Sequence, residues 1–242
     1  MTDGTMSYHD LPAAGGNLKY AGRIAQGYDE KRQKSEKWQV EQDVVQSMLA
    51  DLPRGSWVLD APCGTGRFVE FCRNKGFIYR GIDISQDMIA QAVAKFGNQS
   101  PVARIEMQNG EVIETPQLNI EQRDVLNSGL PDKAVDAALN IRITRWLSPD
   151  QCQQLFREMQ RIVRDRIILT ARIANHPHAR PLELFEAALY DNWALERDIS
   201  GYEPDYRIFQ FRCKASPFLR QREIDAVKTG ADEWTMPPYE AA

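Results

Sequence analysis

Hydrophobic and polar residues recur with two different periods along the chain, and the period switches repeatedly between residue 35 and residue 214. Short apolar runs bounded by turn residues predict buried strands, at residues 56–61, 77–83, 118–126, 134–141 and 165–172. Between them, apolar residues three or four positions apart predict helices, at residues 35–49, 67–74, 85–96, 148–163 and 181–189. Strands that alternate with helices indicate a parallel sheet covered on both faces.

Capping residues mark the ends of these predicted helices. Ser35, Ser85 and Ser148 each precede a helix, where a serine oxygen can accept a backbone N–H of the first turn. The segment 148–151 also places proline at the first helical position and a glutamine suited to a capping box. Gly76 is expected to end the second helix. One face of the first helix is expected to be apolar, formed by Val40, Val44, Val45, Met48 and Leu49.

Two segments depart from the alternation of strands and helices. Residues 103–115 contain two alternating runs around Asn109-Gly110, which is a strong hairpin signal, so a hairpin insertion is expected at about 102–116. Residues 193–200 and 206–214 predict a closing pair of strands. The fold class is therefore α/β: a three-layer Rossmann-like sandwich around a seven-stranded, mostly parallel sheet. Its last strand is antiparallel, and a helical N-terminal cap and the hairpin are additions.

The length of 242 residues suits one domain with additions. The pattern predicts a flexible segment and cap at 1–34, the domain at 35–214 and a C-terminal arm at 215–242. The net charge of −4 provides no overall basic field for nucleic acid or anionic lipid. No stretch approaches the ~20 apolar residues that span a membrane, so a cytoplasmic protein is expected. The four cysteines lack zinc-like spacing, so reduced thiols and no metal are expected, and oligomeric state stays open.

The segment VLDAPCGTGRF, residues 58–68, places a glycine turn at the end of the first strand. Gly64 and Gly66 let a ligand approach the backbone closely, and either a dinucleotide or S-adenosylmethionine uses such a turn. The dinucleotide fingerprint requires a third glycine where this chain has Val69. Asp60, just before the turn, would repel a pyrophosphate but attract an ammonium group. Together these features favour the zwitterionic ligand.

Further candidate ligand contacts follow the next two strands. Asp83 ends the second strand, where a carboxylate can accept two ribose hydroxyls. Met88 lies one turn into the next helix, where its soft side chain can cover an adenine face. Asp124 ends the third strand and can accept from an adenine amino group, while Val125 offers a backbone N–H.

Four segments in order, VLDAPCGTGRF, GIDISQDMI, EQRDVL and VDAALNIRITRWL, resemble the motifs of class I S-adenosylmethionine-dependent methyltransferases, in particular of the small-molecule branch. The resemblance runs from about residue 35 to residue 214. The family usually has glycine where this chain has Pro62, which removes one N–H from the loop. By motif position, the resemblance implies a set of cofactor-binding residues: Tyr28, Asp60, Gly64, Gly66, Asp83, Ile84, Met88, Asp124, Val125 and Asn140.

The acceptor side carries fewer signals. Arg142, Trp146 and His176 are candidates for the acceptor pocket, because they follow the fourth and fifth strands on the expected binding side. No residue is identified as catalytic: His176 could be a general base, but solvated loop histidines are commoner. The expected activity is methyl transfer to an O, N or S atom of a small molecule. Alternatives are a nicotinamide-dependent oxidoreductase and a non-catalytic cofactor- or partner-binding protein; nucleic-acid methylation has no supporting motif.

Overall fold

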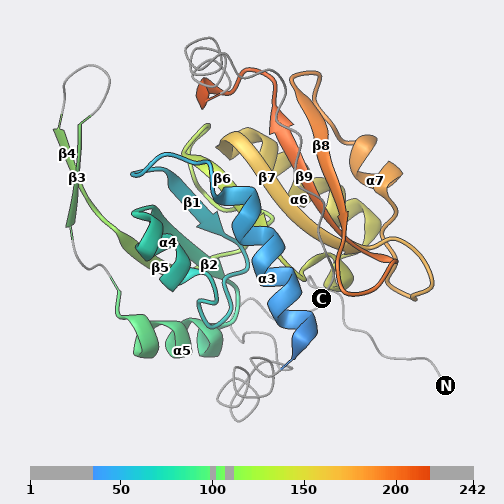
Figure 1. Cartoon of the computed structure of the whole chain (residues 1–242), viewed down its shortest axis with the longest axis horizontal. Coiled ribbons are helices and arrows are strands. Elements are labelled where there is room, and N and C mark those ends of the chain that lie inside the picture. Colours follow the sequence, from blue (N-terminus) through green and yellow to red (C-terminus); the bar gives the residue numbers. More distant parts are fainter. Residues whose placement is uncertain (1–34, 99–101, 107–111, 219–242) are drawn as a thin grey trace.

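Seven strands form one sheet in the spatial order β5-β2-β1-β6-β7-β9-β8. The structure is a computed structural model that describes residues 35–98, 102–106 and 112–218 (Figure 1). The strands of this sheet are β1 (Trp57–Asp60), β2 (Ile78–Asp83), β5 (Leu118–Gln122), β6 (Val135–Asn140), β7 (Val163–Arg172), β8 (Trp193–Ser200) and β9 (Tyr206–Cys213).

One strand of this sheet runs against the others. The pairs β1–β2, β1–β6, β2–β5 and β6–β7 are parallel, whereas β9 is antiparallel to both β7 and β8. The mostly parallel sheet with an antiparallel last strand is therefore confirmed. The reversed direction has a consequence for function, because it brings the first residue of β9, Tyr206, opposite the last residue of β7, Arg172.

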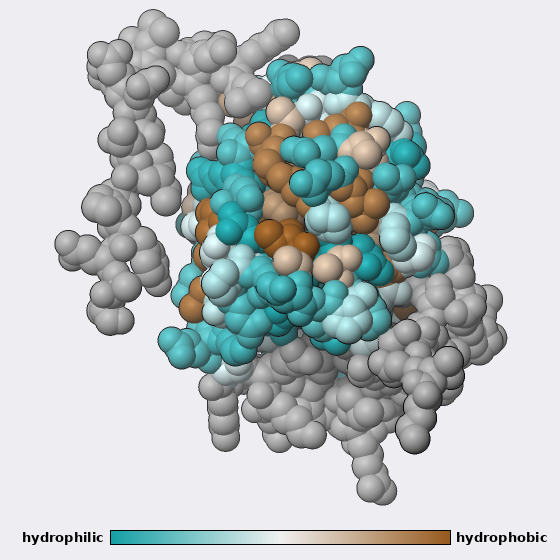
Figure 2. Space-filling model, turned by 90° about the vertical axis from the view of Figure 1, so that its right-hand side faces the viewer, coloured by the Kyte–Doolittle hydropathy of each residue, from teal (hydrophilic) through white to brown (hydrophobic). Residues whose placement is uncertain are grey.

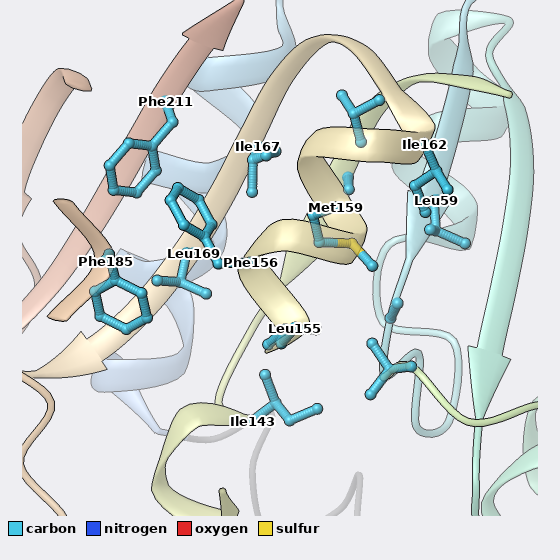
Figure 3. Packing of buried hydrophobic residues seen from close by; sticks show 14 of the residues in the cluster. Leu59, Ile143, Leu155, Phe156, Met159, Ile162, Ile167, Leu169, Phe185 and Phe211 are labelled. Carbon is cyan, nitrogen blue, oxygen red and sulfur yellow. The ribbon is translucent and has the colours of Figure 1, made fainter. Parts of the chain in front are cut away.

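Helices cover both faces of the sheet. They are α3 (Glu36–Leu49), α4 (Val69–Lys75), α5 (Gln86–Phe96), α6 (Pro149–Ile162) and α7 (Leu182–Glu186). Successive strand residues point to opposite faces, so Leu59 packs with α6 while its neighbour Val58 packs with α3 and α4. Figure 3 shows Phe156 and Met159 of α6 directed toward the sheet. These two cores give the three layers that the sequence predicts.

The ends of the helices agree with the sequence in part. Ser85 accepts the N–H of Met88, and Ser148 forms a complete capping box with Gln151. Gly76 ends α4 in the left-handed conformation, as expected. Ser35, however, makes no side-chain cap; the Trp38 N–H donates to the Ser35 backbone carbonyl at 2.9 Å. The first helical turn of α4 also begins at Val69, two residues later than predicted.

The buried face of α3 differs from the predicted one. Val40 and Val44 are only half-buried, and the buried positions are Trp38, Glu41, Val45, Met48 and Leu49. The helix is therefore rotated so that one tryptophan and one carboxylate face the protein interior. A charged residue within the buried stripe requires partners, which the site provides.

The predicted hairpin is present as a separate two-stranded sheet. Strands β3 (Val102–Glu106) and β4 (Val112–Pro116) pair in antiparallel register and extend away from the main sheet (Figure 1). The Asn109-Gly110 turn lies outside the described residues. At the other end of the chain, Ser216 is buried and donates to the Asp165 carboxylate, so residues 215–218 pack on the domain instead of leaving it at once.

The side that carries β8 and α7 shows apolar surface enclosed by polar residues (Figure 2). Tyr190 is the only large hydrophobic residue of the described segments that is classed as exposed, at 45%. Within those segments, no helix has the length and apolar character needed to cross a membrane. All four cysteines are free and buried, in agreement with the expectation of reduced thiols.

Candidate functional site

The carboxyl ends of three neighbouring parallel strands meet at one edge of the sheet. There β1 ends at Asp60, β2 at Asp83 and β6 at Asn140. The chain runs outward from β1 through β2 to β5 and then returns to β6 on the other side of β1. Ligands of open α/β sheets bind at such a reversal of strand order.

A pocket of about 770 Å³, measured to its open mouth, lies at this reversal; we call it the glycine-loop pocket. Its walls come from the glycine loop, the ends of β1 and β2, the start of α5, the segment after β6, and α3. The lining residues are Trp38, Asp60, Pro62, Cys63, Gly64, Thr65, Arg67, Phe68, Asp83, Ile84, Met88, Ile141, Arg142, Ile143 and Trp146.

The two loop glycines have different roles. Gly64 has φ +55°, its N–H donates to Asp83 Oδ2 at 2.9 Å, and a Cβ there would lie 3.5 Å from Met88 Cε. Gly64 therefore faces the pocket. Gly66 has φ +80°, and a Cβ there would lie 2.9 Å from the ring of Phe96. Gly66 is not among the residues that line the pocket. The lack of a side chain at this position instead allows the loop to pack against α5.

We expect Gly66→Ala to lower the free energy of unfolding by about 2–5 kcal/mol. The left-handed backbone costs about 1–2 kcal/mol for a residue with a Cβ, and overpacking against Phe96 adds about 1–3 kcal/mol. Gly55→Ala is the matched control, because φ there is +81° with nothing within 4 Å of the added Cβ. Urea denaturation of both variants measures the difference; equal losses would show that the Phe96 contact costs nothing.

Asp60 is a buried acid with one side-chain partner. The Tyr79 hydroxyl donates to its Oδ2 at 2.7 Å, and the carboxylate is 2% exposed. Burial raises the pKa of Asp60 to about 7, against the lowering effects of Tyr79 and Arg67. A positively charged group in the pocket would stabilise the ionised form of this carboxylate.

Asp83 ties the glycine loop to the start of α5. Its Oδ2 accepts from Gly64 N and its Oδ1 accepts from Ser85 N at 2.8 Å. Burial raises the pKa of Asp83 to about 6, although these backbone N–H groups favour the charged form. A carboxylate has about four lone-pair positions. Two remain for a ligand, so bracing the loop and binding hydroxyls are compatible.

A second pocket of about 550 Å³ adjoins the first and shares Arg142 and Trp146 with it; we call it the arginine pocket. It lies over the carboxyl ends of β6 and β7 and the connection from β8 to β9. Its lining is cationic, polar and aromatic: Arg142, Thr144, Arg145, Trp146, Thr170, Ala171, Arg172, His176, Tyr202 and Tyr206. The reversed direction of β9 brings Tyr206 here, beside the end of β7.

Comparisons with known proteins agree with this geometry. Residues 58–166 match the family model described as a methyltransferase domain. A stretch of 53 residues is 43% identical to malonyl-[acyl-carrier protein] O-methyltransferase of Hamiltonella defensa subsp. Acyrthosiphon pisum (strain 5AT), covering 22% of this chain. That match spans only 20% of the relative's own length.

Two solved structures share the fold at low sequence identity. Magnesium protoporphyrin IX methyltransferase from Synechocystis PCC 6803, solved with bound SAH, has TM-score 0.62 and 13% identity, with 81% of this chain and 96% of that chain covered. The PH0226 protein from Pyrococcus horikoshii OT3 has TM-score 0.60 and 16% identity, with coverage of 83% and 100%. Residues 58–166 are therefore similar to a methyltransferase domain, and the chain shares its fold with these two solved structures.

Several residues that the superfamily motifs single out do not line either pocket. Asp124 Oδ1 accepts from Leu126 N at 2.9 Å and so holds its own turn, and Val125 beside it is buried in the core. Asn140 is fully buried, and its Nδ2 donates to Ala61 O at 2.7 Å. The Oδ1 atom of Asn140 has no hydrogen-bond partner among the described residues. Tyr28 lies outside the described residues.

A buried carboxylate on α3 connects the two pockets. Glu41 is 0% exposed and receives hydrogen bonds from Arg67, Arg142 and Tyr206. The Arg142 Nε lies 2.9 and 3.0 Å from the two Glu41 oxygens. Arg67 also stacks over the Trp38 ring, 3.7 Å from its centroid. The helix is thereby fixed over the edge of the sheet.

Arg142 holds an unusual backbone conformation in this network. Its φ is +62°, which residues with a Cβ rarely adopt. The Arg142 N–H donates to Thr170 Oγ1 at 2.7 Å, and Glu41 holds the guanidinium, so contacts at both ends fix the conformation. Burial opposes the charge of Arg142, but the Glu41 carboxylate outweighs it and raises the pKa of Arg142.

Sequence reasoning missed the residues that frame the sides of the site, above all Glu41, Arg67, Arg172, Tyr202 and Tyr206. One signal was present for Glu41, which lies three or four positions from Trp38 and Val45 on a helix. A carboxylate within an apolar stripe predicts a buried ion pair. The other residues carried no comparable local signal. Among the described residues, no cluster of His, Cys, Asp or Glu is arranged to hold a metal ion.

Proposed function

We propose that this protein transfers the methyl group of S-adenosylmethionine to an O, N or S nucleophile of a small molecule. The observation that carries the proposal is the pairing of charges across the two adjoining pockets. Two buried carboxylates, Asp60 and Asp83, line the glycine-loop pocket, where the two lining arginines, Arg67 and Arg142, are paired with Glu41. Three arginines line the neighbouring pocket, and Arg142 is shared by both. A cationic donor suits the first pocket, and its reacting methyl would face the second.

Five residues of the glycine-loop pocket are proposed to hold the donor. Asp60 attracts the ammonium group, and the free lone pairs of Asp83 accept the ribose hydroxyls. Gly64 permits close approach of the ligand, while Ile84 and Met88 pack against the adenine. Three further residues are proposed to contact the adenosine. Asp124 would do so through its second oxygen, Val125 through its backbone N–H, and Asn140 through its unpartnered Oδ1. Tyr28 is proposed to fold over the donor.

When bound, the donor supplies an electrophilic methyl on a sulfonium. The protein then needs to align the acceptor with that methyl and to exclude water, because positioning provides much of the rate in such a step. His176 is poorly placed to act as a base. Its Nδ1 accepts from His178 N at 3.0 Å, so the neutral ring carries its proton on Nε2. The arrangement therefore suits an acceptor that is already deprotonated or one that loses its proton to water.

The alternatives are a nicotinamide-dependent oxidoreductase and a protein that binds the donor without transfer. We expect SAH to bind with micromolar or tighter affinity in isothermal titration calorimetry and NAD to bind far more weakly. Asp60 disfavours a pyrophosphate at this position. Tighter binding of NAD would refute the methyltransferase proposal. SAH binding with no labelled methyl on any component of a cell extract would favour the non-catalytic alternative.

SAH affinity is expected to fall as the pH decreases from 8 to 5. The free protein takes up protons on Asp60 and Asp83, whose pKa values burial raises to about 7 and about 6. SAH binds the ionised forms, so it must displace these protons at lower pH. Each carboxylate then costs up to about tenfold in affinity per pH unit below its own pKa. Titrations at pH 8, 7, 6 and 5 measure the slope; an affinity that does not change with pH would place the ligand away from both acids.

A further inference from the structure

The arginine pocket contains more positive charge than its protein partners neutralise. Arg142 is compensated by Glu41, and Arg172 by Glu203 and Asp205. Arg145 is exposed, and its guanidinium lies over the face of the Trp146 ring, with Cζ 4.8 Å from the ring centroid. Within the described residues, no carboxylate forms an ion pair with Arg145, and no Asp or Glu is among the lining residues of this pocket.

The neighbouring imidazole is affected by this positive charge. Partial burial lowers the pKa of His176 most, Arg172, Arg145 and His178 lower it further, and Asp205 opposes them. A concave surface lined with charge of one sign concentrates ions of the opposite sign. The charge of this local surface is positive, whereas the net charge of the whole chain is −4.

We infer that the methyl acceptor is an anion whose carboxylate or phosphate group is held in this pocket by Arg145. The inference rests on the proposed function, because it uses the position of the pocket beside the donor. Arg142 and Trp146 line both pockets. An anion bound to Arg145 would therefore be separated from the proposed donor site only by these shared side chains. The Trp146 ring supports the guanidinium, which presents its N–H groups in the fork that carboxylates and phosphates match.

The first test measures anion binding to the full chain saturated with SAH. Benzoate, its uncharged analogue benzamide, and inorganic phosphate are titrated while the NMR signals of the His176 ring are followed. We expect benzoate or phosphate to bind at least tenfold tighter than benzamide and to raise the pKa of His176. Arg145→Gln should abolish the preference for the anion. Arg157→Gln, the same charge change at an exposed position on α6, should preserve it.

The outcomes separate this inference from the proposed function. If SAH fails to bind the wild-type chain, the proposed function fails. If SAH binds equally to wild type and Arg145→Gln but neither anion is preferred over benzamide, or the preference survives Arg145→Gln, the inference alone is overturned. Whether benzoate or phosphate binds tighter identifies the class of anion.

The second test concerns the acceptor itself. Small molecules from an extract are divided on an anion exchanger at neutral pH, and each fraction is incubated with methyl-labelled S-adenosylmethionine and the full chain. Label is expected in the retained, anionic fraction, and Arg145→Gln should raise the KM for that fraction at least tenfold while the KM for the donor is unchanged. Label only in the unretained fraction would contradict the inference while leaving methyl transfer established.

Discussion

Glu41→Gln is expected to lower the free energy of unfolding by about 3–5 kcal/mol, because removing one member of a buried ion-pair network leaves the other charges uncompensated. Glu41 is 0% exposed, and the Arg67 side chain is only 8% exposed. The remaining glutamine keeps one acceptor oxygen but cannot balance the charges of Arg67 and Arg142. The loss can be measured by urea denaturation, followed by circular dichroism.

Asp43→Asn is the matched control, since it removes the same charge from an exposed position of the same helix. Surface substitutions of this kind usually change stability by less than about 0.5 kcal/mol. A second readout is SAH affinity, which should weaken in Glu41→Gln because Trp38 and Arg67, held by Glu41, line the glycine-loop pocket. A loss of stability no greater than that of Asp43→Asn would mean that the network does not hold α3 in place.

Asp83→Asn is expected to weaken SAH binding by about 1.5–3 kcal/mol, roughly tenfold to 150-fold, because charge-assisted hydrogen bonds to the ribose are lost. The structure adds a complication, since Asp83 also accepts from Gly64 N and Ser85 N. Asparagine keeps one acceptor oxygen for these N–H groups, whereas alanine would leave both without a partner. Calorimetric titration with SAH gives the affinities.

A comparison with the 2′-deoxy analogue of SAH separates the ribose contact from the bracing of the loop. If Asp83 binds the 2′-hydroxyl, the analogue should bind the wild type more weakly than SAH does but should lose little further affinity in Asp83→Asn. Asp87→Asn, an exposed acid four residues along, is the control for charge alone. Equal losses of affinity for SAH and for the analogue would show that Asp83 only braces the loop and that the ribose binds elsewhere.

The buried acids of the glycine-loop pocket and the arginines of its neighbour are brought together by the direction of the strands. Parallel strands place their carboxyl ends at one edge, where Asp60 and Asp83 come directly after β1 and β2. On the other side of β6, the same edge receives the end of β7 and, through the reversal of β9, the residues that precede that strand. Arg172 and Tyr206 are therefore neighbours although they are far apart in the sequence.

The sequence alone determined the elements and named several of the residues that line the two pockets. Hydrophobic period, capping serines and glycine turns are local signals, so they placed the seven strands and most helix ends within a few residues. Asp60, Gly64 and Asp83 were found for the same reason, because each marks the end of a strand or a turn. Gly66 was also named, but it packs against Phe96 and is not among the residues that line the glycine-loop pocket.

Only the tertiary structure decided how α3 is rotated and which charges meet over the edge of the sheet. Glu41 contacts Arg142 and Tyr206 across 101 and 165 residues of sequence. The same holds for the convergence of Arg145, Arg172 and Tyr202 in one pocket. Such contacts depend on the order and direction of the strands and on the packing of a helix across them, and no local period contains that information.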